Sequence, residues 1–178
     1  RLTIDLPEIE NNLIDLSNKI NGIPIQFVFN LDETGMVEYE DAQKKLVIVP
    51  FNYTKKTAPY PVNRSEKHGS CLVCISMEGM FGIPQIAVQR ATLDSEIYNH
   101  ISKDVAQVVH TTEGYINTSS FKHYMQTIFI PELQKLRNQY NYHGPAILIM
   151  DGLLAHRNAA QTLHLNNYNI IPHFLPSH

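Results

Sequence analysis

Apolar positions recur along the chain with two periods, one typical of helices and one typical of strands. Over residues 5–22 they recur at helical spacing, after Asp5 as a cap and Pro7 in the first turn, which predicts a helix that packs through one face. Over residues 25–31 they alternate with polar ones, which predicts a strand with Asp32 at its carboxyl end and a turn at Gly35. The stripe of the predicted helix is Ile9, Leu13, Leu16 and Ile20.

The middle of the chain contains a predicted hairpin. Residues 70–77 and 84–89 are rich in strand-forming side chains and are joined through a glycine-containing turn. Residues 46–49 could form a short strand, and the Pro-, Thr- and Lys-containing residues 51–61 are typical of a loop. Residues 91–117 are mixed and predict at most a short helix over 94–101.

The second half predicts helices that alternate with strands. A long helix begins after a cap at Ser119 or Ser120 and kinks at Pro131. Residues 146–150 are apolar throughout, as expected of a parallel strand covered on both faces, and Asp151 follows them. A helix over 157–165 and a strand over 170–175 complete an α/β sheet with crossover helices.

Composition favours one domain without a disulfide scaffold. A chain of 178 residues with 43% hydrophobic content can bury one sizeable core. There is no apolar run of the length a membrane helix needs, so we expect a soluble, intracellular protein without a membrane partner. Cys71 and Cys74 lie three apart in a predicted strand and face opposite ways, which favours buried structural cysteines over a zinc or redox pair.

Charge is distributed unevenly. The net charge is -3, yet six basic residues against Glu66 give residues 44–68 a charge of +5, which leaves -8 for the rest. Charge alone favours a solvated loop here, with a basic arm that binds nucleic acid as the alternative.

Asp32 and Asp151 are the candidate chemical groups, because each follows an apolar strand. In open α/β sheets ligands bind at the carboxyl ends of strands, and two carboxylates there would suit Mg²⁺. The alternative is that each aspartate only closes its own strand by bonding to the following turn. The residues alone leave both interpretations open.

Four sequence blocks resemble one family. Asn30-Leu31-Asp32-Glu33-Thr34-Gly35 is similar to the N-x-D-E-T-G motif of the DDE superfamily endonuclease domain in pogo/Tigger/jerky-type transposases, which are Tc1/mariner-related. Residues 147–152 with His156 resemble its second aspartate block, residues 62–79 the stretch through its second strand, and residues 174–178 the start of its third block.

The resemblance implies an RNase H-like mixed sheet flanked by helices over residues 23–178, preceded by a helical lead-in over 1–22. It also implies that Asp32 and Asp151 are catalytic and hold two Mg²⁺ or Mn²⁺ ions, which serve phosphodiester cleavage and strand transfer. The family's third acid would follow the last block, beyond His178, so we expect the chain to be an incomplete, inactive fragment; no Asp or Glu follows Asp151.

Five further residues are candidates for contacts around the acids or with DNA. Asn30 shares the face of Asp32 and could order the site or be a turn-side amide, while Glu33 should point away from the metals. His156 could contact phosphate or water, or could instead be a capping or partly buried histidine. Arg64 and Lys67 match a family block and could contact DNA phosphate.

The function implied by the resemblance is DNA transposition. The expected partners are transposon ends and target DNA, a homodimer is an assembly the family allows, and a nuclear location would follow in a eukaryote. The first alternative is a domesticated, non-catalytic scaffold that binds DNA or protein. The second is an RNase H-like nuclease unrelated to transposition, which the carboxylates alone would permit.

Overall fold

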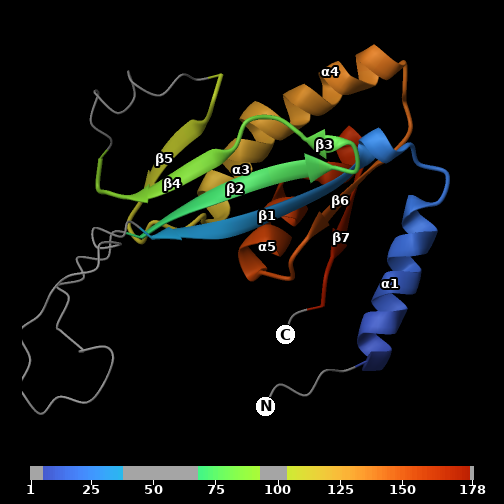
Figure 1. The fold of residues 1–178 in the computed structure, drawn as a ribbon, viewed down its shortest axis with the longest axis horizontal. Coiled ribbons are helices and arrows are strands. Elements are labelled where there is room, and N and C mark those ends of the chain that lie inside the picture. Colours follow the sequence, from blue (N-terminus) through green and yellow to red (C-terminus); the bar gives the residue numbers. More distant parts are fainter. Residues whose placement is uncertain (1–5, 38–67, 93–103, 177–178) are drawn as a thin grey trace, which may run out of the picture.

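The computed structural model describes residues 6–37, 68–92 and 104–176. One mixed sheet forms the centre of the molecule, with helices against it (Figure 1). The helical elements are α1 (Leu6–Ile20), η1 (Ile25–Phe27), α3 (Thr118–Tyr124), η2 (Met125–Phe129), α4 (Ile130–Tyr140), α5 (Leu154–Thr162) and η3 (Leu165–Tyr168). The strands are β1 (Val28–Val37), β2 (His68–Ser76), β3 (Gly79–Met80), β4 (Gln85–Gln89), β5 (Gln107–Thr111), β6 (Ala146–Met150) and β7 (Ile170–Phe174).

The sheet has the order β5-β4-β2-β1-β6-β7, with β3 paired to β2. The antiparallel pair β2·β4 confirms the predicted hairpin. Strand β1 also pairs antiparallel with β2, and β6 pairs in parallel with both β1 and β7. Figure 1 shows α3, α4 and α5 on one side of the sheet, while α1 lies alongside β7. The predicted α/β sheet with crossover helices is therefore confirmed.

Strand β1 begins later and ends later than the sequence predicted. Residues 25–27 form the turn η1 after Pro24, and the strand then continues to Val37. Gly35, predicted to form a turn, is paired in the strand with Ser70. Asp32 therefore lies inside β1 rather than at its end, because antiparallel pairing with β2 overrides the local preference of glycine for turns.

The predicted long helix is present, with a different cap and with a π-helical segment ahead of its proline. Asn117 is the N-cap, and its side chain accepts hydrogen bonds from the backbone N–H groups of Ser119 and Ser120. A proline within a helix lacks an N–H and crowds the preceding turn. Here the five-residue π-helical segment η2 lies between α3 and α4 and ends at Phe129, two positions before Pro131.

The main core lies between the sheet and the long helix. Phe29 of β1 meets Phe81 and Phe129 with ring centroids 4.5 and 5.3 Å apart. Strand β6 is buried at Ala146, Ile147, Leu148 and Met150, as a parallel strand covered on both faces should be. The fully buried large side chains include Phe27, Phe29, Leu31, Leu72, Phe121, Tyr124, Met125, Phe129 and Leu133.

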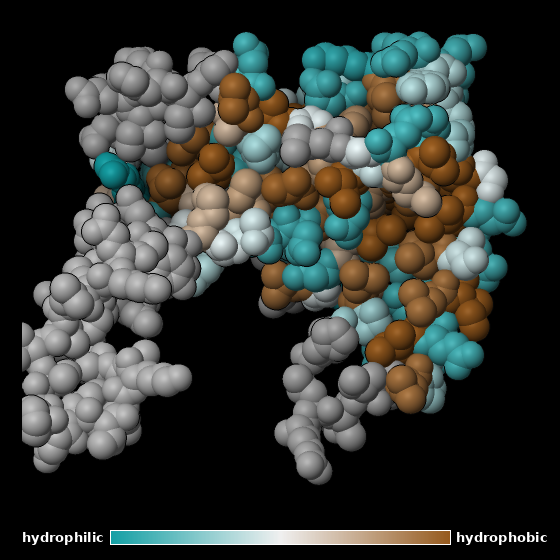
Figure 2. Space-filling model, viewed as in Figure 1, coloured by the Kyte–Doolittle hydropathy of each residue, from teal (hydrophilic) through white to brown (hydrophobic). Residues whose placement is uncertain are grey.

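Helix α1 confirms a predicted helix, but it contacts the sheet differently from the prediction. None of its residues is buried, and Leu13, in the predicted apolar stripe, is 56% exposed. Its polar side chains reach β7 instead: the Asn12 amide donates to the Phe174 carbonyl at 3.0 Å, and Asn12 also bonds the ring of His173 at 3.0 Å. Figure 2 shows apolar side chains at the surface along this helix.

Other predictions have mixed outcomes. The helix predicted at 157–165 begins earlier, at Leu154, and the last strand is confirmed as β7. Strand β5 was not predicted. The expectations for 46–49, 51–61 and 94–101 lie outside the described residues. No helix in the described ranges combines the length and the apolar character that a membrane crossing needs.

Candidate active site

The two candidate aspartates come from adjacent parallel strands. β1 and β6 pair in the register Val28 with Ile147 and Asn30 with Ile149. Continued by two positions, this register brings Asp32 level with Asp151, although β6 itself ends at Met150. Neighbouring strands lie about 4.8 Å apart, so the two backbones are close at this point. Two aspartates so far apart in the sequence can converge only if their strands are neighbours, and β1 and β6 are neighbours in the sheet.

Each carboxylate has one oxygen engaged by the protein. The Asp32 Oδ1 atom accepts from the backbone N–H of Glu33 at 2.8 Å, and the Asp32 side chain is exposed. The Asp151 Oδ1 atom accepts from the backbone N–H of Leu153 at 3.3 Å and lies 2.5 Å from Nδ1 of His156. Within the described residues, neither Oδ2 atom has a protein hydrogen-bond partner. These two oxygens are available to a cation or to water.

His156 lies beneath this carboxylate rather than on the surface. Its side chain is 1% exposed, whereas that of Asp151 is 39% exposed. The imidazole packs on Phe121 of α3, with ring centroids 4.6 Å apart. A side chain this buried cannot reach a DNA phosphate. Of the two predicted roles, the structure agrees better with the partly buried histidine, and its burial is nearly complete.

Glu33 and Asn30 point in opposite directions from the same strand. The Glu33 Oε1 atom accepts from the backbone N–H of Ile116 at 3.0 Å, on the side covered by α3. Strand alternation therefore turns Asp32 the other way. Asn30 is half-buried, and its amide donates to the Ile149 carbonyl at 3.5 Å, a long bond between β1 and β6. Glu33 thus holds the segment that leads into α3, and the Asn30 side chain links β1 to β6.

The remaining predicted contacts fall elsewhere. Arg64, Lys67 and the rest of the basic stretch up to residue 67 lie outside the described residues. Both cysteines are free, and burial raises the pKa of the Cys74 thiol, as expected of a structural cysteine. Among the described residues, no group of three or more His, Cys, Asp or Glu side chains is arranged to hold a metal ion.

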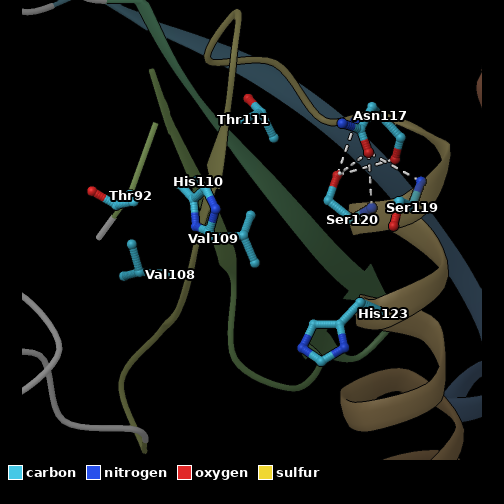
Figure 3. Close-up of a pocket in the computed structure, with 9 residues that line it drawn as sticks. All are labelled: Thr92, Val108, Val109, His110, Thr111, Asn117, Ser119, Ser120 and His123. Carbon is cyan, nitrogen blue, oxygen red and sulfur yellow. Dashed lines mark hydrogen bonds between the residues drawn. The ribbon is translucent and has the colours of Figure 1, made fainter. Parts of the chain in front are cut away.

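A hollow of about 590 Å³ with a mixed polar and apolar lining lies between β5 and the start of α3 (Figure 3). Asn117, Ser119 and His123 line it from the helical side, and His110 lines it from β5. Neither Asp32 nor Asp151 contributes to its lining. The hollow is therefore separate from the carboxylate pair.

Two contacts near Asp151 were not predicted from the sequence. The Arg157 Nε atom donates to the Gly152 carbonyl at 3.1 Å, and its guanidinium lies 4.8 Å from the centre of the Phe174 ring. They fix the loop that carries Asp151 against α5 and β7. Bonds to backbone carbonyls have no sequence signature. A histidine five positions after Asp151, in contrast, is visible in the sequence as a possible partner of its carboxylate.

The fold resembles that of Mos1 transposase structures. A pre-cleavage Mos1 transpososome gives a TM-score of 0.57 at 15% identity, over 99% of this chain and 44% of that one. The Mos1 mariner paired end complexes with Mn and with Mg give 0.56 and 0.55, both at 16% identity, over 99% of this chain and 44% and 45% of those. The mixed sheet flanked by helices thus matches the RNase H-like core of Mos1 transposase. The chain spans less than half the length of these proteins.

Sequence comparison gives the family. No curated protein has a sequence that matches this one. Residues 90–178, half of the 178 residues, match the family described as DDE superfamily endonuclease. The matched residues include β6, Asp151 and His156. The match identifies the superfamily and does not identify the pogo/Tigger/jerky subgroup. The chain therefore belongs to the DDE superfamily endonucleases.

Proposed function

We propose that this chain is the catalytic domain of a DNA transposase, in which Asp32 and Asp151 hold divalent cations for phosphodiester cleavage and strand transfer. The observation that carries this proposal is the parallel pairing of β1 with β6, whose register, continued two positions past its last pair, brings Asp32 level with Asp151. Family membership and the transposase-like fold support it.

The donor set suits Mg²⁺ or Mn²⁺. Both ions prefer oxygen ligands, and Mg²⁺ is commonly held by one or two carboxylates together with water and substrate phosphates. Asp32 and Asp151 each have one oxygen engaged by the protein and the other free among the described residues. A bound metal pair would activate the attacking water or 3′-hydroxyl and stabilise the leaving oxygen. The printed names of the Mos1 complexes include Mn and Mg, which is consistent with this choice.

Several finer assignments belong to the same proposal. The pogo/Tigger/jerky subgroup rests on the resemblance of the four sequence blocks. The third acid is assigned to no residue of this chain. DNA as partner is supported by the transpososome named among the similar structures. A domain boundary at residues 22 and 23, a homodimer and a nuclear location in a eukaryote stay predictions from the resemblance.

The test is Mn²⁺-dependent nicking of supercoiled plasmid by the full-length protein. We expect Asp32→Asn and Asp151→Asn each to abolish nicking, because each removes an anionic ligand while keeping the shape of the side chain. Glu132→Gln is the matched control: it neutralises an acid on α4 that pairs with Lys135 away from the site, and it should nick normally. Nicking that survives in both aspartate variants would refute the proposal. A folded, DNA-binding wild type that never nicks would favour the domesticated, non-catalytic scaffold.

A further inference from the structure

His156 has an unusual combination of burial and polarity. Its side chain is almost completely enclosed, yet Nδ1 is 2.5 Å from an oxygen of the partly exposed Asp151 carboxylate. An ionised carboxylate can only accept hydrogen bonds, so Nδ1 carries the proton and donates it. Hydrogen bonds to charged groups are stronger than those between neutral groups. The contact is therefore directional as well as close.

His156 is held through its ring and through its backbone. Its ring lies against Phe121 at an interplanar angle of 36°, and its backbone N–H donates to the Leu153 carbonyl at 3.1 Å. The bond from Leu153 N–H to Asp151 Oδ1 meets the same oxygen that His156 reaches. Two donors, one in the loop before α5 and one on α5, thus converge on Oδ1.

We infer that His156 is a positioning residue, which fixes Asp151 through Oδ1 and leaves Oδ2 as the oxygen that binds a divalent cation. The inference rests on the proposed function, and it assigns His156 a part that does not involve touching DNA. An aspartate without partners rotates about two side-chain bonds, and binding a cation must then stop this rotation. Partners of metal-binding side chains typically contribute about 10–100-fold in metal affinity or activity.

Two substitutions separate positioning from simple core filling. His156→Phe keeps a ring that can pack on Phe121 but removes the donor. His156→Asn removes the ring but can place its amide N–H close to where Nδ1 lies, because the two side chains are alike up to that atom. If His156 only fills the core, Phe is the milder change. If His156 positions Asp151, Asn is the milder change for metal binding and Phe the milder one for stability.

The experiment is a Mn²⁺ titration of the full-length protein, with free Mn²⁺ followed by electron paramagnetic resonance, alongside thermal unfolding of each variant. We expect His156→Phe to weaken Mn²⁺ binding by about 10–100-fold, while its thermal stability stays above that of His156→Asn. His156→Asn should bind Mn²⁺ more tightly than His156→Phe. Asp151→Asn should lose the same binding site, which identifies the site being measured.

The outcomes distinguish this inference from the proposed function. Wild-type affinity in folded His156→Phe, with binding lost in Asp151→Asn, would overturn the positioning role and leave the carboxylate site in place. Unchanged Mn²⁺ binding in Asp151→Asn, or no saturable binding by the wild type, would overturn the metal site and the inference together. Tighter binding by His156→Phe than by His156→Asn would show that packing alone matters.

Discussion

Arg137 on α4 holds the two loops that lead into β6 and β7, and replacing it should destabilise the whole domain. Its side chain is 7% exposed, and its guanidinium donates to three backbone carbonyls, those of Tyr168 at 2.7 Å, Asn169 at 2.9 Å and Gly144 at 3.3 Å. These carbonyls lie just before β7 and β6, and no carboxylate pairs with Arg137 among the described residues.

The magnitude follows from the groups left without a partner in Arg137→Met, which keeps the volume of the stem. The Asn169 carbonyl retains its bond from Ala146 N–H at 2.9 Å, so the main loss falls on the Tyr168 and Gly144 carbonyls. Hydrogen bonds to charged groups contribute about 1.5–3 kcal/mol each. Removing a buried charge, with an Nε that has no partner, offsets part of this. We expect a net loss of about 2–4 kcal/mol in the free energy of unfolding.

Urea unfolding measures this loss as a lower midpoint with an unchanged slope. At about 2–4 °C per kcal/mol for a chain of this size, Tm should fall by about 5–15 °C. Arg137→Lys should be intermediate, because an ammonium cannot span three carbonyls as a planar guanidinium does. Lys135→Met, on the same helix and 72% exposed, should change stability by less than about 0.5 kcal/mol. An Arg137→Met variant as stable as this control would refute the reasoning.

Two further predictions concern His173, on β7, and Glu33, on β1. Burial, followed by the Lys19 charge, lowers the pKa of His173, so the unfolded chain binds a proton before the folded one does. The free energy of unfolding should therefore fall as pH drops below about 6.5. Urea titrations between pH 7.5 and pH 5 should show a smaller fall for the His173→Gln variant than for the wild type. Equal falls in the two proteins would contradict this prediction. Glu33→Gln should nick plasmid like the wild type, because Gln can still accept from Ile116 N–H, whereas Asp32→Asn should not; loss of nicking in a folded Glu33→Gln would place Glu33 among the acids that act.

The parts of the fold predicted well are those with an unambiguous local pattern. The apolar run before Asp151 predicted a covered strand, and the period of the apolar positions predicted the long helix. Prediction failed where a distant partner decides the outcome. Gly35 favours a turn locally, yet it lies in a strand because β2 pairs with it. The stripe on α1 predicted an apolar contact, whereas the helix meets β7 through Asn12 and other polar side chains.

The sequence indicates the two candidate acids but not the side chains that contact them. Asp32 and Asp151 stand out because each follows apolar strand residues, and the resemblance strengthened both. The sequence places His156 in a motif with Asp151. Its burial, however, depends on Phe121, which is 35 positions earlier and on another helix. Arg137 was not noticed at all, because carbonyl acceptors are present at every residue and leave no mark in the sequence.

The pairing of β1 with β6 also has a consequence for how the protein folds. Asn30 and Ile149, which lie side by side in the sheet, are 119 positions apart in the sequence. Closing so long a loop is entropically costly, and contacts of this kind form slowly. The antiparallel strands β1, β2 and β4 can associate while the chain is still being synthesised, but Asp151 reaches Asp32 only after the long helix and β6 have emerged. The newly made chain would therefore complete its antiparallel half well before it could hold a cation.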